Sequence, residues 1–174
     1  MTQNNDDFKK VLNQTLQFEG GYTEDSGGKT NYGVRQDIYD AYAKQNKMES
    51  KDVRNLKYGE VKDFYKKNYW EDPKINMLPR EISASVFDYG VNAGQGTAIK
   101  AVQNIIGTKA DGIIGKKTIA AINKYVEKNG VKELHKKILD NRVEHYNNLV
   151  ISNPQKYSKY LSGWLNRVNT ISQR

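Results

Sequence analysis

The sequence predicts a mainly α-helical fold of about eight helices, with at most a small β-hairpin between Tyr22 and Val34. Apolar residues recur three and four positions apart in one segment after another, which is the period of a helix packed on one face. Glycines and prolines separate these segments, so each pattern stops where a helix would end. With 174 residues, 37% of them hydrophobic and 28% charged, we expect a single domain with one core.

The first predicted helix carries an apolar stripe that leads to an acidic residue. The stripe consists of Phe8, Val11, Leu12, Thr15 and Leu16. One more turn reaches Glu19, and Gly20 and Gly21 then end the helix because glycine accepts a positive φ. We therefore expect Glu19 to close this helix on its core-facing side. Burial and the negative end of the helix dipole would both disfavour a charged carboxylate there, which makes Glu19 a candidate proton donor.

A polar, turn-rich segment follows the two glycines and brings Asp25 and Thr30 within a few positions of Glu19. An acid on a helix end, faced by a second carboxylate and a hydroxyl, is the set of groups that hydrolysis of a glycosidic bond requires. We assign Asp25 as the second carboxylate and Thr30 as the group that holds the water. Spacing alone favours an ordinary structural turn over a catalytic site.

Seven further helices are predicted, over about residues 34–47, 61–70, 80–93, 98–106, 119–129, 131–149 and 157–168. The segment at 80–93 is apolar nearly all the way round, which is typical of a helix in the middle of a domain. Its polar exceptions, Asp88 and Asn92, need partners if they are buried. For Asp88 we favour a role in bracing neighbouring helices. For Asn92, a bracing role and a position in the substrate cleft are equally compatible with the sequence. The aromatic residues of the last helix are interpreted as core.

The residue types in the chain disfavour metal and thiol chemistry. Cysteine is absent, and the two histidines, His135 and His145, lie ten residues apart in one predicted helix. This spacing does not make a paired metal site, so we do not expect a zinc amidase or peptidase. For the hydrolysis of a glycosidic bond we expect no metal or organic cofactor.

The net charge of +8 predicts an anionic partner, for which nucleic acid, a membrane surface and the bacterial cell wall all qualify. The lysine pairs are dispersed along the chain, and solvated helix faces explain them as well as a binding surface does. No apolar run approaches the length that spans a membrane. The first seven residues lack the basic and apolar pattern of a secretory signal, so none is expected.

Two motifs frame the polar segment: Glu19-Gly20-Gly21-Tyr22 before it and Thr30-Asn31-Tyr32-Gly33 at its end. They resemble the signature of glycoside hydrolase family 108, whose members are N-acetylmuramidases that cleave peptidoglycan. The resemblance continues in the same order along nearly the whole chain, through Tyr69-Trp70, Phe87 to Gly94, Asp111 to Gly115 with Thr118, and Gly163 to Val168. Family members usually have a longer, Asp-Pro-rich loop where this chain has only Thr23 to Ser26, so Glu24 competes with Asp25 as the second carboxylate.

The resemblance implies a lysozyme-like fold and hydrolysis of the β-1,4 bond between N-acetylmuramic acid and N-acetylglucosamine. Residues 1–95 would form the catalytic portion, and residues 96–174 a C-terminal helical portion similar to a predicted peptidoglycan-binding region. The expected partner is bacterial peptidoglycan. We expect a monomer that does not bind nucleic acid and does not insert stably into a membrane. A phage endolysin and a bacterial muramidase both fit. Either would be made in the cytoplasm and reach the wall through a holin or an export system, and the missing signal favours the endolysin.

Three aromatic residues are predicted to flank the sugar cleft, because sugar rings stack on aromatic faces: Tyr22, Tyr32 and Trp70. Asn92 is a further candidate for substrate binding. Trp70 ends a predicted helix, so packing on the core is a strong alternative for it.

Two other functions remain compatible with the sequence. A lytic transglycosylase would use Glu19 without needing Asp25 and would release an anhydro product. A non-enzymatic, basic helical protein that binds nucleic acid would need none of Glu19, Asp25 and Thr30, and its binding would fall steeply with salt.

Overall fold

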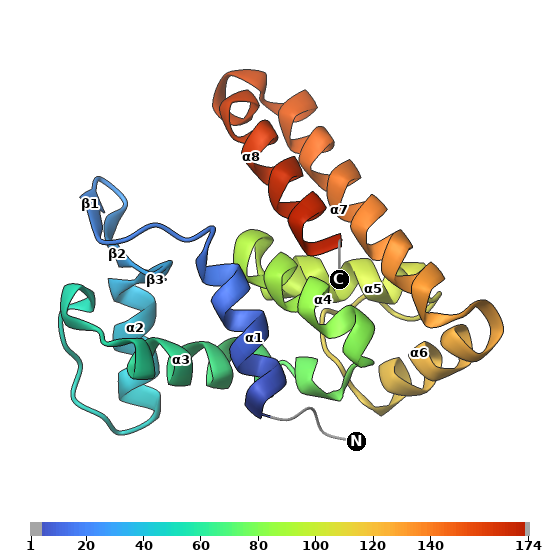
Figure 1. The fold of residues 1–174 in the computed structure, drawn as a ribbon, viewed down its shortest axis with the longest axis horizontal. Coiled ribbons are helices and arrows are strands. Elements are labelled where there is room, and N and C mark those ends of the chain that lie inside the picture. Colours follow the sequence, from blue (N-terminus) through green and yellow to red (C-terminus); the bar gives the residue numbers. More distant parts are fainter. Residues whose placement is uncertain (1–4, 173–174) are drawn as a thin grey trace. The chain divides into compact units, whose positions relative to one another are not determined.

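The structure, a computed structural model, describes residues 5–172 (Figure 1). These residues form eight α-helices: α1 Asn5–Leu16, α2 Gln36–Gln45, α3 Tyr58–Tyr65, α4 Arg80–Ala93, α5 Gln95–Ile105, α6 Lys116–Asn129, α7 Val131–Ser152 and α8 Pro154–Ser172. A three-stranded antiparallel sheet lies between α1 and α2 in the chain, with strands β1 Thr23–Asp25, β2 Gly28–Asn31 and β3 Val34–Arg35 in that order. The short 3₁₀ segments are η1 Val53–Asn55 and η3 Ile75–Met77, and the π-helical segment η2 Lys66–Glu71 continues α3. The prediction of a mainly α fold with a small β element is confirmed.

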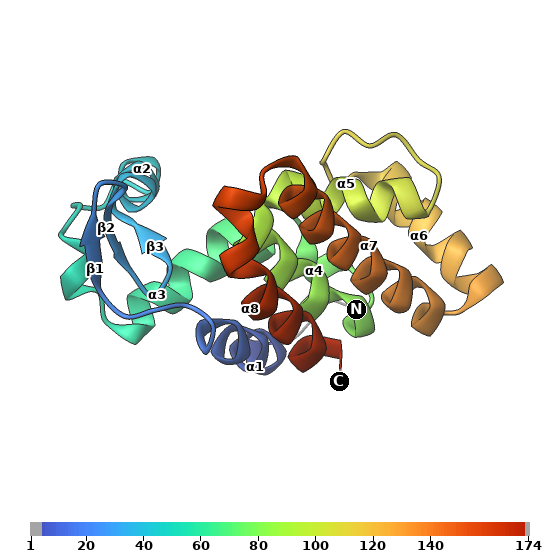
Figure 2. The same ribbon diagram turned by 90° about the horizontal axis from the view of Figure 1, so that it is seen from above.

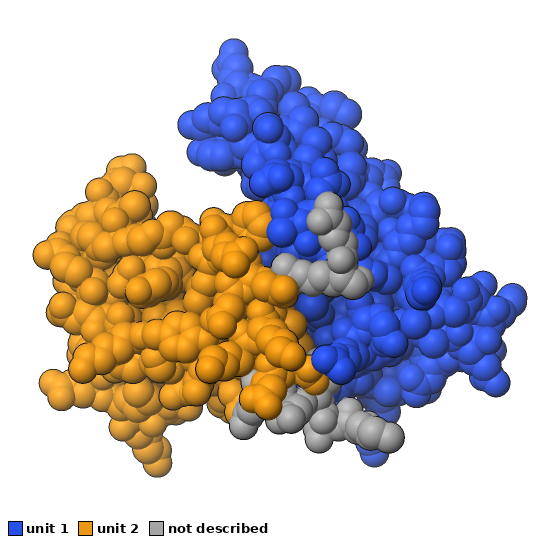
Figure 3. Space-filling model, viewed as in Figure 1, with its two compact units in different colours: residues 1–2, 73–174 blue, residues 3–72 orange. Residues whose placement is uncertain are grey.

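The chain forms two compact units, one of residues 3–72 and one that begins at residue 73 (Figure 3). The sequence predicts a single domain whose two portions adjoin near residue 95. In the structure, the boundary between the two compact units along the chain falls between Asp72 and Pro73.

The unit of residues 3–72 is built on an aromatic core. Phe8, Leu12 and Thr15 of α1 are 2%, 0% and 1% exposed, so the predicted stripe does face the core. Phe8 packs on Trp70 with 5.4 Å between the ring centroids. The other large rings of this core come from α2 and α3: Tyr39, Tyr42, Phe64 and Tyr65. The end of α1 is thereby fixed to the same core that carries α3 and η2.

The small sheet is held by two tight turns. β1 and β2 pair from Thr23 opposite Thr30 to Asp25 opposite Gly28. β2 and β3 are joined by Tyr32 and Gly33, whose φ angles of 51° and 74° are those of a type I′ hairpin turn. Such a turn matches the twist of the paired strands, so two residues are enough to join β2 to β3.

In the unit of residues 73–172, α4 is the central helix and contacts α5, α7 and α8 (Figure 2). Eight of its residues are buried, including Phe87, which is fully inaccessible to solvent. The prediction of a central helix at 80–93 is confirmed for this unit.

The polar residues of α4 brace α7 and α8. Arg167 of α8 donates two hydrogen bonds to Asp88, each of 2.8 Å, and Arg142 of α7 places Nη2 2.8 Å from the same carboxylate. Arg142 also donates to the hydroxyl of Tyr146 at 2.7 Å, which in turn donates to Asn92 Oδ1 at 2.5 Å. Asp88 therefore has the bracing role that the sequence analysis favoured.

The aromatic face of α8 lies partly in solvent, contrary to its interpretation as core. Tyr160 is 46% exposed, and Trp164 stacks on Tyr146 with 4.8 Å between the ring centroids. The buried residues of α8 are Arg167, Val168 and Ile171, near its C-terminal end. α8 packs mainly on α7, and the two helices form a hairpin that extends past α4 (Figure 1).

Candidate active site

Glu19 follows α1 instead of closing it. The helix ends at Leu16, and the N–H groups of Phe18 and Glu19 donate to the carbonyls of Thr15 and Leu16 at 3.0 and 3.2 Å. These bonds to the third residue back tighten and end the last turn. Gly20 and Gly21 do not have positive φ angles, so the predicted glycine stop at these positions is wrong. Glu19 is half-buried in the bend that leads to the sheet.

The carboxylate of Glu19 lies against the turn between β2 and β3. A Cβ atom placed on Gly33 would lie 2.7 Å from Glu19 Oε2 and 2.7 Å from the hydroxyl oxygen of Tyr65. That hydroxyl donates to the carbonyl of Tyr32 at 2.9 Å, which ties the turn to α3. The missing side chain of Gly33 thus leaves the space into which Glu19 fits.

Tyr69 forms a second aromatic wall near Glu19. Its ring packs on Tyr65 with 5.3 Å between the centroids. Burial raises the pKa of the Tyr69 hydroxyl, and the negative charge of Glu19 raises it further. Tyr69 is therefore neutral at physiological pH and adds no charge beside the carboxylate of Glu19.

The pleat of β1 turns its two acidic side chains to opposite faces of the sheet. Thr23 pairs with Thr30, and alternate residues of a strand face the same way, so Asp25 shares a face with Thr30. Glu24 lies on the other face, opposite Lys29. Of the two competing carboxylates, Asp25 is the one on the same side of the sheet as the predicted water-positioning hydroxyl.

Glu24 belongs to a chain of polar contacts on its own face of the sheet. It accepts a hydrogen bond of 2.6 Å from the hydroxyl of Tyr22 and lies 3.3 Å from Nη2 of Arg54. Arg54 also donates to the Tyr22 hydroxyl at 2.7 Å and stacks its guanidinium 4.4 Å from the centre of the ring. Beside them, Lys29 donates to Asp52 at 2.6 Å, and this bond holds the pKa of Asp52 below its usual value. These contacts attach the hairpin to the segment around η1.

Asp25 lies at the end of β1, where the chain turns. Its Oδ1 accepts a hydrogen bond of 2.7 Å from the N–H of Gly27, and the side chain is exposed. The turn fixes one carboxylate oxygen and leaves the carboxylate accessible to water. Thr30, on the neighbouring strand, is half-buried.

The four predicted substrate-binding residues differ in accessibility. Tyr32 is 38% exposed beside Gly33, and Tyr22 has one ring face covered by Arg54. Trp70 is 2% exposed and packs on Phe8, so it has no free face on which a sugar could stack, and its alternative role in the core fits the structure better. Asn92 belongs to the other unit, where it accepts the hydrogen bond from Tyr146, and a role for it in substrate binding stays a prediction.

Sequence reasoning did not find Arg54, Tyr65 and Tyr69 as neighbours of the site. Tyr65 and Tyr69 have the spacing of ordinary core residues on a helix. Arg54 is 32 residues from Tyr22 along the chain, and no local pattern links the two. Only the helical spacing of Tyr65 and Tyr69, four residues apart, could have suggested that these two rings lie together.

Replacing Gly33 with alanine should lower turnover about tenfold, because the new methyl group would displace the Glu19 carboxylate. The φ angle of +74° adds backbone strain to this contact. Steady-state rates on a glycan substrate and the melting temperature would separate the loss of positioning from the loss of stability.

Gly107→Ala is the matched control for this substitution. Gly107 has nearly the same φ angle, +71°, and an added Cβ would meet no atom within 4 Å. The control should lose similar stability but keep its activity. Equal activities of the two variants would show that Gly33 does not position Glu19.

Two features are absent from residues 5–172. No group of three or more histidine, aspartate or glutamate side chains is placed to hold a metal ion. No helix formed by these residues combines the length and apolar character needed to cross a membrane.

Comparisons with known proteins match both parts of the chain. The family model described as glycosyl hydrolase 108 matches residues 12–94, and the model described as a predicted peptidoglycan domain matches residues 97–169. Among solved structures, that of Brucella abortus SagA is similar, with a TM-score of 0.78 and 26% sequence identity over 98% of this chain and 94% of that chain. No curated protein matches the chain. The first of these matches contains Glu19, Asp25 and Thr30.

Proposed function

We propose that Glu19 is the general acid of the reaction that this protein catalyses. The chain belongs to the glycosyl hydrolase 108 family and is a peptidoglycan hydrolase of the lysozyme type. The bond cleaved would be the β-1,4 bond between N-acetylmuramic acid and N-acetylglucosamine. The observation that carries this proposal is the fit of the Glu19 carboxylate against Gly33, close to the Tyr65 hydroxyl. A carboxylic acid held on a rigid turn, half-buried and beside a neutral tyrosine, is suited to deliver a proton to one point.

The proposed reaction uses the two carboxyl groups in different roles. Glu19 gives its proton to the glycosidic oxygen as the bond to the anomeric carbon breaks, and positive charge builds up on that carbon. The carboxylate of Asp25 stabilises this charge and takes a proton from the attacking water, whose oxygen joins the anomeric carbon. The hydroxyl of Thr30, on the same face of the sheet as Asp25, holds the water by a hydrogen bond.

Tyr32 and Tyr22 are the proposed contacts for the sugar rings. Tyr32 is exposed next to the Gly33 turn, and an aromatic ring there can stack on the apolar face of a sugar. Tyr22 is half-buried, Arg54 covers one face of its ring, and its hydroxyl is held by Glu24 and Arg54. Trp70 is left out of this proposal because it is buried.

We also propose that a single chain is active. Glu19, Asp25 and Thr30 all belong to the unit of residues 3–72, so no second copy is needed to complete the set. Sedimentation equilibrium at the concentration of the activity assay should give the mass of one chain, and a stable dimer would contradict this.

Asp25→Asn should lower turnover about tenfold or more, because the amide cannot take up a proton from water. Glu24→Gln should cost less, since Glu24 lies on the opposite face and its contacts with Tyr22 and Arg54 are exposed. Rates of reducing-end release from peptide-free glycan strands, measured for both variants at equal stability, compare the two carboxylates. If Glu24→Gln is the more damaging change, Glu24 and not Asp25 is the second carboxylate.

A further inference from the structure

A pocket of about 400 Å³ lies between α5 and α7 in the unit of residues 73–172. Three polar side chains of α5 line it, Thr97, Lys100 and Asn104, at positions i, i+3 and i+7. Three polar side chains of α7 line it at the same spacing: Asn141, Glu144 and Asn148. This spacing puts each set on one face of its helix, and the two faces belong to helices that contact each other. The volume is in the range of small-molecule and peptide sites.

The polar groups of this pocket are unpaired within the described chain. Among residues 5–172, none of the six side chains just named makes a hydrogen bond or ion pair with another residue. Other charged residues of α7 do pair, since Lys136 contacts Asp140 at 2.6 Å and Lys137 contacts Glu133 at 3.9 Å. The pocket thus collects donors and acceptors that are left for a ligand or for water.

The charges of the pocket wall are balanced. Lys100 is its one cation at neutral pH, because burial and then the positive charge of Arg142 lower the pKa of the lining residue His145. Glu144 is its one anion. Between them, the amides of Asn104, Asn141 and Asn148 can each donate and accept, as the amide groups of a peptide require.

We propose that this pocket binds a short peptide that carries both a free amine and carboxylates, namely the stem peptide of peptidoglycan. Lys100 would bind a carboxylate, Glu144 the side-chain amine of the peptide, and the asparagines its backbone amides. The proposal rests on the proposed function and deepens it, because it assigns the recognition of the peptide to a site separate from Glu19. The six polar residues all lie within the segment matched by the predicted peptidoglycan domain.

The composition of the pocket favours a peptide over the other polymers that the sequence left open. A phosphate backbone needs several cations, and the wall has one lysine balanced by one glutamate. A sugar ring is usually bound by an exposed aromatic face, and the tyrosine of this pocket, Tyr89, is only 1% exposed.

Calorimetric titration of the full chain tests this proposal with two probes, neither of which contains the bond to be cleaved. The first probe is the free stem tetrapeptide with its diamino-acid side chain. The second is the peptide-free disaccharide with N-acetylmuramic acid at its reducing end, in which the bond from the anomeric carbon of N-acetylmuramic acid to N-acetylglucosamine is absent. The tetrapeptide should bind and the disaccharide should not compete with it. If the disaccharide binds and the pocket substitutions weaken its binding, the pocket is a glycan site and the proposal is overturned.

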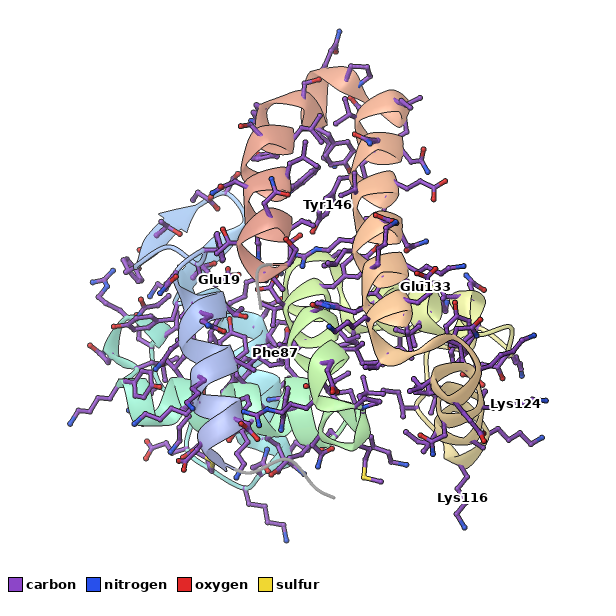
Figure 4. The ribbon with its side chains drawn as sticks, turned by 45° about the vertical axis from the view of Figure 1, so that its right-hand side comes forward. Glu19, Phe87, Lys116, Lys124, Glu133 and Tyr146 are labelled. Atoms are coloured by element: carbon purple, nitrogen blue, oxygen red, sulfur yellow. The ribbon has the colours of Figure 1, made fainter. Side chains whose placement is uncertain are left out.

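Lys100→Met and Glu144→Gln should each weaken the binding of the tetrapeptide about three- to fivefold, the range for an exposed charge pair. Acetylation of the side-chain amine should remove the effect of Glu144→Gln and leave that of Lys100→Met. The controls are Glu133→Gln, about 16 Å from Glu144 along α7, and Lys124→Met on α6, both labelled in Figure 4, and they should bind like the wild type. No binding of the tetrapeptide, or equal binding by pocket and control variants, would overturn the proposal.

Cleavage of peptide-free glycan strands separates this inference from the proposed function. A protein that cleaves such strands but binds no tetrapeptide keeps the function and loses the peptide site. One that binds the tetrapeptide through Lys100 and Glu144 but cleaves no glycan keeps the peptide site and loses the assignment of Glu19.

Discussion

Glu19→Gln should lower turnover on peptidoglycan by about 100-fold or more while the fold is retained. The amide has nearly the same shape as the carboxyl group, so it can occupy the space beside Gly33, but it has no proton to give to the leaving oxygen. Rates of reducing-end release measure the turnover. The circular dichroism spectrum and the melting temperature show whether the fold is retained.

Glu49→Gln is the matched control, because Glu49 is an exposed glutamate of the same unit, in the loop after α2. It should keep the activity of the wild type. A Glu19→Gln protein that clears peptidoglycan as fast as Glu49→Gln would show that the proton comes from another group.

Asp88→Asn should lower the free energy of unfolding of the unit of residues 73–172 by about 3–5 kcal/mol. The substitution removes the negative charge on which Arg142 and Arg167 converge, and both guanidinium groups are buried, with side chains 0% and 5% exposed. Two cations would then remain in the interior with no anion to balance them. Denaturant unfolding followed by circular dichroism gives the loss of stability directly.

Asp140→Asn provides the comparison for a charge pair in solvent. Asp140 contacts Lys136 at 2.6 Å, and the two side chains are 62% and 70% exposed, so its loss should cost less than about 1 kcal/mol. If Asp88→Asn is no more destabilising than Asp140→Asn, the buried ion network does not hold α4, α7 and α8 together.

The periodicity of the sequence predicts the faces of the helices better than their ends. The stripe of α1 and the buried character of α4 are both found in the structure, because an apolar face must pack wherever the helix stops. The end of α1 depends on which carbonyls the N–H groups of Phe18 and Glu19 reach, and no side-chain pattern records this. The helix was therefore predicted three residues too long.

Contacts between distant segments account for most of what the sequence could not predict. The hydrogen bond from Arg54 to Tyr22 and the fit of Glu19 against Gly33 join residues that no short motif connects. Glu24 and Asp25 could be told apart only once the pairing of β1 with β2 was known, because that pairing decides which of them faces the same way as Thr30. The pocket between α5 and α7 was missed for a related reason, since each polar stripe alone has the appearance of a solvated helix face.

Mass analysis of the soluble fragments that the purified protein releases from peptidoglycan tests the central claim most directly. The account predicts fragments that end in N-acetylmuramic acid with a free reducing end, which shows that water was added across the bond, and it predicts that Glu19→Gln releases almost none of them. Fragments that end in anhydro-N-acetylmuramic acid would instead make the protein a lytic transglycosylase. Fragments with N-acetylglucosamine at the reducing end, or no soluble fragments at all, would contradict the account.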